Sequence, residues 1–145
     1  MVPIIDHVQV AMPAGGEEAA RRFYGGLLGL AEVERPANLR KRGGVWFATG
    51  NLALHLGVDR ECRPAEKAHV AFRVTGLAAL RQRLVAAGYA VSDDEPLPGF
   101  DRFYVKDPFG NRMELLAAPE MEALGARRPR GRRSGRSAAL VTRPR

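Results

Sequence analysis

The amino-acid sequence predicts an α+β fold built from two copies of one β-α-β-β-β unit. Some segments alternate apolar and polar residues with the period of a strand, and two others carry apolar residues at helical spacing. The order of these segments occurs once in residues 3–58 and again in residues 68–118, joined by a polar linker at 59–67. We therefore expect one domain over residues 1–120, with a curved mixed sheet and helices covering its apolar side.

The first unit begins with an alternating strand at residues 4–12, which a Pro-Ala-Gly-Gly run ends. Residues 17–28 predict a helix, because apolar residues recur every three or four positions and two glutamates lie in the first turn. A charged connection follows and includes a short strand at 31–34. Residues 45–49 and 51–58 predict a hairpin across a Gly-Asn turn.

The second unit repeats this order. Residues 69–74 alternate as a strand, and residues 77–87 predict a helix that a glycine closes. A short strand at 89–92 leads into a polar loop with two prolines. Residues 102–106 and 112–117 then form the closing hairpin.

The turn of that closing hairpin has the sequence DPFGN. Asp107 caps it with its side chain, Pro108 fixes its own φ, and Gly110 or Asn111 takes a positive φ. The strand after it carries Glu114 in the middle of an apolar run. A buried carboxylate is costly unless a partner compensates it, and the histidines of the chain are candidate partners.

Charge and composition limit the classes of partner. The charges of residues 1–120 balance, and the net charge of +7 comes from an arginine-rich tail at 121–145 that we expect to be disordered. The balance predicts no basic face on the folded body, so we do not expect a nucleic-acid partner. No apolar run is long enough to span a membrane, and the single cysteine, Cys62, is typical of a cytoplasmic protein.

Strand parity predicts a metal site. Four strands each have an apolar face that must pack under the helices, and the opposite face of each carries one potential ligand. These ligands are His7, His55, His69 and Glu114. A histidine on a sheet surface is often only a tolerated polar residue, but all three histidines of the chain fall in this set. If the faces line one hollow, three imidazoles and a carboxylate converge on a divalent transition metal.

The β-α-β-β-β repeat, the opening DHVQVAMP and the closing KDPFGNRMELL resemble the vicinal oxygen chelate superfamily over residues 3–118. This group includes glyoxalase I, extradiol dioxygenases, fosfomycin-resistance thiol transferases and bleomycin-resistance proteins. The resemblance implies a cup-shaped sheet and, as metal ligands, His7, His69 and Glu114. Glyoxalase I has a further glutamate where this chain offers His55 or, with another hairpin register, Ala53. The resemblance also implies a homodimer.

An open metal position would bind a small substrate through two adjacent oxygens, and the ion, whether Zn, Ni, Mn or Fe, would act as a Lewis acid. Glu114 and Tyr104 are the candidate catalytic residues. The candidate substrate-binding residues are Arg73, Arg102, Arg112, Trp46 and Phe103. The ligand histidines favour a metalloenzyme with isomerase, lyase, thiol-transferase or dioxygenase chemistry. The alternative is a metal-free protein that binds a drug or metabolite, as bleomycin-resistance proteins do.

Overall fold

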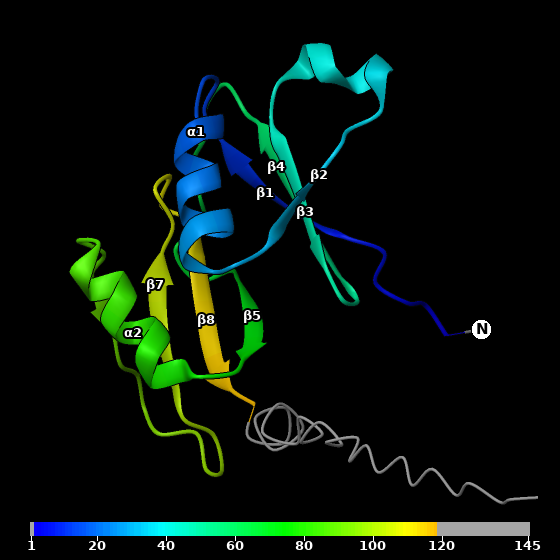
Figure 1. Ribbon diagram of the computed structural model, residues 1–145. Coiled ribbons are helices and arrows are strands. Elements are labelled where there is room, and N and C mark those ends of the chain that lie inside the picture. The colour runs from blue at the N-terminus through cyan, green and yellow to red at the C-terminus, as the bar shows by residue number, and fades with distance from the viewer. Residues whose placement is uncertain (1, 119–145) are drawn as a thin grey trace, which may run out of the picture.

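The computed structural model describes residues 2–118, which form two four-stranded mixed sheets (Figure 1). The strand order is β1-β4-β3-β2 in the first sheet, here called the N-sheet, and β5-β8-β7-β6 in the second, the C-sheet. The predicted α+β fold class is confirmed, and the strands form two sheets. The predicted disordered tail lies outside the described residues.

The N-sheet belongs to the first unit. Its elements are β1 (Val8–Met12), α1 (Glu17–Ala20), the π-helix η1 (Arg21–Leu27), β2 (Ala31–Val33), the 3-10 helix η2 (Ala37–Arg42), β3 (Val45–Thr49) and β4 (Leu52–Val58). The first strand starts later than predicted, and η2 falls inside the connection for which only a strand was expected. β1 pairs parallel with β4, while β3 pairs antiparallel with both β2 and β4.

The helix of the first unit changes its hydrogen bonding along its length. In η1 the N–H of Leu28 donates to the carbonyl of Phe23, five residues earlier, at 3.0 Å. This wider turn brings two consecutive aromatic side chains, Phe23 and Tyr24, to the core side, where both are at most 1% exposed. The helical spacing of apolar residues in 17–28 includes Phe23 but does not include Tyr24.

The C-sheet belongs to the second unit. Its elements are β5 (His69–Val74), α2 (Leu77–Ala86), β6 (Val91–Ser92), β7 (Arg102–Lys106) and β8 (Arg112–Ala117). β5 pairs parallel with β8, and β8 pairs antiparallel with β7. The turn between β7 and β8 forms as predicted. Asp107 Oδ1 accepts the N–H groups of Phe109 and Asn111 at 2.9 and 2.8 Å, and Gly110 has φ +94°.

One hydrophobic core joins the two units. It contains Phe23, Phe47 and Leu56 from the first unit, and Leu84 and Leu115 from the second. The helices cover the apolar sides of the sheets, α1 next to β1 and α2 next to β7 and β8 (Figure 1). The buried side chains therefore fix the position of one sheet relative to the other.

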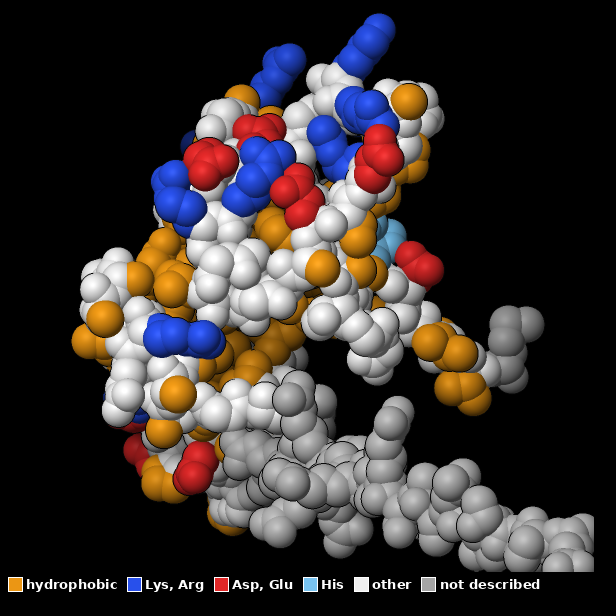
Figure 2. All heavy atoms as spheres, viewed as in Figure 1, with side chains coloured by type: hydrophobic (Ala, Val, Ile, Leu, Met, Phe, Trp, Pro, Cys, Tyr) orange, Lys and Arg blue, Asp and Glu red, His pale blue; other side chains and the backbone are white. Residues whose placement is uncertain are grey.

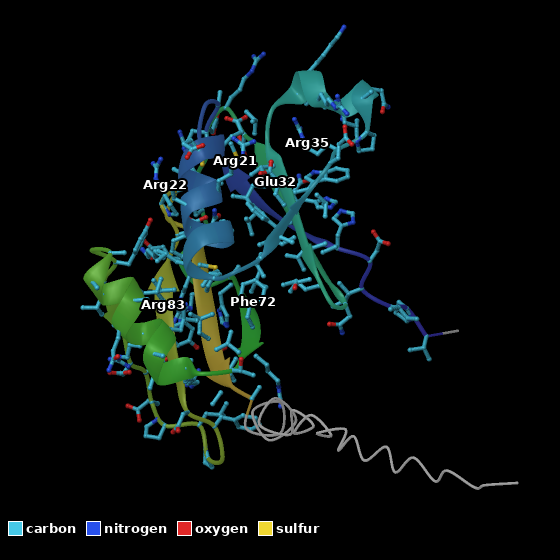
Figure 3. All side chains as sticks on the ribbon, in the orientation of Figure 1. Arg21, Arg22, Glu32, Arg35, Phe72 and Arg83 are labelled. Carbon is cyan, nitrogen blue, oxygen red and sulfur yellow. The ribbon has the colours of Figure 1, made fainter. Side chains whose placement is uncertain are left out.

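Polar contacts add to this junction. The hydroxyl of Tyr24 donates to Asp107 Oδ2 at 2.7 Å, and Asn111 Nδ2 donates to the carbonyl of Ala11 at 2.7 Å. Arg83, on α2, points toward the end of η1 and donates to the carbonyl of Leu27 at 3.1 Å (Figure 3). The turn of the C-sheet is thus bonded to both the helix and the first strand of the other unit.

Exposed ion pairs occupy matching places in the two units. Arg21, on η1, binds Glu32 on β2 through two hydrogen bonds, and Arg81, on α2, binds Asp93 after β6 in the same way (Figure 3 labels the first pair). Figure 2 shows lysine and arginine side chains interspersed with acidic ones over α1 and η2. No helix within residues 2–118 is long and apolar enough to cross a membrane.

Candidate functional site

The face of the C-sheet that lies opposite the core, here called the C-face, carries Glu114 at its centre. Register places Ala71 and Tyr104 beside Glu114, and His69 and Lys106 beside Arg112. Side chains of paired residues share a face of the sheet, so this parity is the predicted one. The core side chains Met113 and Leu115 lie on the other face.

Glu114 is held from two sides. Its side chain is only 10% exposed, and Oε1 accepts a hydrogen bond from Arg102 Nη1 at 2.7 Å, while Oε2 lies 3.1 Å from His69 Nε2. Burial raises the pKa of Glu114, but the hydrogen bonds from Arg102 and His69 outweigh burial, so the pKa lies below its usual value. The carboxylate is therefore ionised at neutral pH.

His69 has a defined tautomer. Its Nδ1 lies 2.9 Å from the carbonyl oxygen of Lys67, and a carbonyl oxygen only accepts, so Nδ1 carries a proton. In the neutral ring, Nε2 then presents a lone pair to Glu114 Oε2. The separation of 3.1 Å is that of an ordinary hydrogen bond, which a proton on Nε2 would make, and a metal ion bound by both atoms would take the place of that proton. A carbonyl bonded to Nδ1 is the arrangement that orients metal-binding imidazoles.

The corresponding face of the N-sheet, here called the N-face, carries a column of stacked rings. The ring of His55 lies 3.8 Å from that of Trp46, nearly parallel to it, and 4.3 Å from that of His7. Burial lowers the pKa of His55, and the neighbouring His7 lowers it further, whereas Asp6 opposes them. His55 is therefore a neutral imidazole at neutral pH, as a metal ligand must be.

His7 is oriented in the same manner as His69. Its Nδ1 lies 2.7 Å from Asp6 Oδ2, an acceptor, so Nδ1 carries a proton, and in the neutral ring Nε2 presents a lone pair. In both histidines an oxygen atom is thus the hydrogen-bond partner of Nδ1. The donor set of two oriented imidazoles, a neutral third imidazole and an ionised carboxylate fits a divalent transition metal.

The four predicted ligands do not meet within one chain. No group of three or more metal-binding side chains occurs within residues 2–118, because His7 and His55 lie on the N-face while His69 and Glu114 lie on the C-face. Ala11, at the end of β1, contacts Asn111 near the start of β8. His7 is at the opposite end of that extended strand, roughly 13 Å away. Strand parity fixes the face of each ligand but not how the two sheets are placed, so it left open whether the faces of one chain or of two chains would come together.

The predicted substrate-binding residues divide by face. Arg73, Arg102 and Arg112 lie on the C-face with Tyr104, whose hydroxyl accepts a hydrogen bond from Arg102 at 2.6 Å. Trp46 lies on the N-face against His55, as described above. Phe103 does not line the site, because strand alternation sends it into the core, where it is 1% exposed. That expectation is corrected.

The balanced charges of residues 1–120 are not spread evenly over the body. The C-face carries Arg73, Arg102, Lys106 and Arg112 around Glu114. A charge balance summed over the sequence does not show this concentration, because it ignores which strand face each residue occupies. No sequence pattern indicated Asp94, whose Oδ2 lies 4.0 Å from Arg102 and 3.9 Å from Arg112. Asp94 follows β6 in an irregular loop, so no periodicity could assign its direction.

Comparison with known proteins supports the resemblance. The family model described as a glyoxalase-like domain matches residues 9–116 of this chain. No curated protein sequence matches it. A solved structure of a glyoxalase family protein from Bacillus anthracis is 48% identical, covers 81% of this chain and 96% of its own, and has a TM-score of 0.75.

More distant structures share the fold. A glyoxalase/dioxygenase from Nostoc punctiforme is 24% identical with a TM-score of 0.66, over 80% of this chain and 91% of its own. The fosfomycin resistance protein FosX from Listeria monocytogenes, in its tetragonal form, is 16% identical with a TM-score of 0.62, over 81% of this chain and 93% of its own. Proteins of different activity therefore share this architecture, which leaves the choice of reaction to the site.

Proposed function

Because this chain belongs to the glyoxalase-like domain family, we propose that it is a metal-dependent enzyme acting on a small substrate with two adjacent oxygens. The metal ligands are His7, His69 and Glu114, with His55 as a fourth. Tyr104 and Glu114 are the residues proposed to act on the substrate. The ion is Zn, Ni, Mn or Fe, all of which accept imidazole and carboxylate.

The orientation of the two histidines carries this proposal. In His7 and in His69 an oxygen atom accepts a hydrogen bond from Nδ1, so Nε2 is the nitrogen that could bind a metal. Surface histidines have no reason to share this arrangement at equivalent positions of two repeats. His69 Nε2 and an ionised Glu114 oxygen lie 3.1 Å apart, which is close enough for both to bind one metal ion.

We propose further that the centre is completed by two protomers. The donors occur as two pairs, one on each face, and neither pair alone supplies the three or four ligands that such a metal requires. In a two-fold dimer, His7 and His55 of one protomer would face His69 and Glu114 of its partner, and the symmetry would generate two equal sites.

The residues of the C-face suit the proposed chemistry. A divalent ion bound there would supply Lewis acidity and hold both substrate oxygens. Arg102 holds Glu114 Oε1, so that Oε2 is the oxygen presented toward His69. The hydroxyl of Tyr104 accepts from Arg102 and keeps its own proton available for donation to a substrate oxygen. Isomerisation, thiol transfer and oxygen insertion all begin from a chelated substrate of this kind.

The second candidate function is metal-free binding of a small molecule. One observation favours it: Glu114 is already neutralised by Arg102 and needs no metal for charge compensation. In this alternative the two faces bind the molecule directly, and His69 takes a second proton instead of a metal.

Metal analysis of untagged protein tests the proposal. We expect about one divalent ion per chain, and at least tenfold weaker binding of added Zn or Ni after His69→Ala, since a lost ligand or its support typically costs 10–100-fold. The matched control is Gln9→Ala, a polar residue of β1 paired in register with His55. Sub-stoichiometric metal that His69→Ala leaves unchanged would favour the metal-free alternative.

A further inference from the structure

Arg112 has hydrogen-bond donors that nothing in the described chain uses. Its guanidinium lies over the ring of Tyr104, with Cζ 3.9 Å from the ring centroid, and its side chain is only 22% exposed. Stacking on Tyr104 fixes the position of the guanidinium. Within residues 2–118 it makes no hydrogen bond, so an immobilised cation keeps all its N–H groups available for a ligand.

Arg102 has an unmet donor as well. Its Nη1 and Nη2 donate to Glu114, to Tyr104 and to the carbonyl of Glu95. Its Nε is buried without a partner. A buried guanidinium nitrogen without an acceptor is costly, and a ligand oxygen would remove that cost.

Asp94 marks the position between the two guanidiniums. Its Oδ2 lies 4.0 Å from Arg102 Nη2 and 3.9 Å from Arg112 Nη2, close enough for attraction but too far for a hydrogen bond. Its Oδ1 is engaged by the N–H of Glu95 at 2.8 Å. The neighbouring Asp93 faces away and is bound to Arg81 on α2. The loop thus holds one carboxylate near both arginines without filling their donor positions.

Two cavities adjoin Arg112. One, of about 310 Å³, is also lined by His69, and the other, of about 250 Å³, by Tyr104 and Lys106. Arg112 therefore lies between the ligand histidine and a second cationic side chain. A small anion could reach its guanidinium from either side.

We propose that Arg112 and Arg102 form an anion subsite for a carboxylate or phosphoryl group of the ligand, and that Asp94 is the internal anion which this group displaces. The subsite deepens the proposed function by assigning a charge to the substrate. An oxyanion of the substrate would make charge-assisted hydrogen bonds to the two arginines, whereas Asp94 is too far from them to make such bonds. Because these donors belong to the chain itself, the subsite operates with or without metal.

The test is a titration of metal-free protein with inorganic phosphate and, separately, with acetate at constant ionic strength. Nuclear magnetic resonance signals of arginine Nε–H groups report binding. We expect the Arg102 and Arg112 signals to shift and saturate together. The tighter of the two probes identifies the group, phosphoryl or carboxylate. Saturation fails to occur if the guanidiniums are only structural, and that result would overturn the proposal.

Matched variants make the test specific. Asp94→Asn should tighten binding about fivefold, because it removes a competing charge from a partly exposed site. Asp93→Asn removes the same charge from the same loop but faces Arg81, so it should change affinity less than twofold, within the spread of exposed charge effects. Equal effects of the two variants would show general electrostatics and contradict the proposal.

A third variant removes the cation. Arg112→Gln should weaken binding at least tenfold, as expected for a lost charge-assisted contact, and Arg112→Lys should retain part of it. If Arg112→Gln is unfolded by circular dichroism, Arg112→Lys decides alone, and unchanged affinity would count against the subsite. If the protein fails to bind metal but still binds the anion saturably, the anion subsite is supported and only the proposed metalloenzyme function is contradicted.

Discussion

The N-face and the C-face have the same place in two repeats but opposite chemistry. The N-face offers the stacked rings of Trp46, His55 and His7, none of which carries a fixed charge. The C-face surrounds one carboxylate, Glu114, with four basic side chains on its three longest strands. The comparison shows that the repeat preserves which residues enter the core, while the residues between them are free to specialise.

This division has a consequence for the ligand. If two protomers bring an N-face and a C-face together, one wall of the site is flat and uncharged and the other is cationic. The metal donors then lie where the two walls meet, with imidazoles from both. A substrate with an uncharged part and an anionic end would match both walls.

The largest difference between the faces should appear in metal affinity. Glu114→Gln keeps the size of the side chain but removes its charge, so Zn or Ni should bind at least about 100-fold more weakly, by the loss of a charged ligand. His55→Gln on the N-face should cost about tenfold or less, as a fourth ligand would. Isothermal titration calorimetry measures both. A greater loss with His55→Gln would reverse the assignment of the main ligands.

The next largest effect should be a loss of stability when the junction between the two sheets is changed. Tyr24→Phe removes the hydroxyl that donates to buried Asp107, and we expect a loss of about 2 kcal/mol in the free energy of unfolding, since a buried carboxylate loses a donor. Denaturant unfolding measures this value. Tyr89→Phe is the control, because Tyr89 also packs on Phe23 but lies at the edge of the core. Equal losses would show that the hydroxyl of Tyr24 adds nothing.

The same contact predicts an alkaline effect. Burial raises the pKa of Tyr24 well above its ordinary 10.0, and Asp107 raises it further. The folded state therefore holds this proton more tightly than the unfolded state does. The stability from Tyr24 is complete below pH 10.0 and is lost as the pH rises from there toward the folded-state pKa. In Tyr24→Phe the free energy of unfolding should decline less at alkaline pH than in the wild type. An identical decline in both proteins would show that Tyr24 is not its source.

A smaller effect should be visible on the N-face by fluorescence. Trp46 is the only tryptophan of the chain, and protonation of the stacked His55 should quench its emission. Because burial and His7 lower the pKa of His55, the midpoint in metal-free protein should lie below 6.5. His7→Ala should raise that midpoint, and His55→Ala should abolish the transition. A midpoint above 6.5 would exclude the stacked, half-buried ring.

The smallest effect should come from the exposed pair on the outer side of the N-sheet. Arg21 and Glu32 are both 44% exposed, so solvent screens most of their attraction. Glu32→Gln should change the free energy of unfolding by about 0.5 kcal/mol or less. Denaturant unfolding of Glu32→Gln, measured in parallel with Tyr24→Phe, gives this change in free energy. A loss above that of Tyr24→Phe would mean that surface pairs, and not the buried junction, hold the units together.

Much of the fold followed from the sequence because its signals are local. Strand parity placed Leu54 and Leu56 inside and His55 outside, and the DPFGN turn formed around Asp107 as expected. The π-helical turn that buries Tyr24 was not predictable, because helical periodicity assumes one regular spacing. The buried bond between Tyr24 and Asp107 joins residues 83 positions apart, and no local pattern encodes it.

The site followed only in part for the same reason. Parity assigned the correct face to each predicted ligand, and it did so for Arg102 and Arg112 as well. It could not tell which sheet faces would meet, and within residues 2–118 the four ligands lie in two pairs. Nor could it find Asp94, which acts from a loop where residues have no periodic direction.

A mixed-dimer experiment tests the shared metal centre most directly. We expect the His7→Ala protein and the Glu114→Ala protein each to lack metal when prepared separately. The two proteins are then unfolded, mixed in equal amounts and refolded together. If each site takes His7 from one protomer and Glu114 from its partner, every mixed dimer regains one intact site. Random pairing should then restore about a quarter of the wild-type metal content. Metal content that stays at the level of the separate variants would contradict a centre shared between two chains.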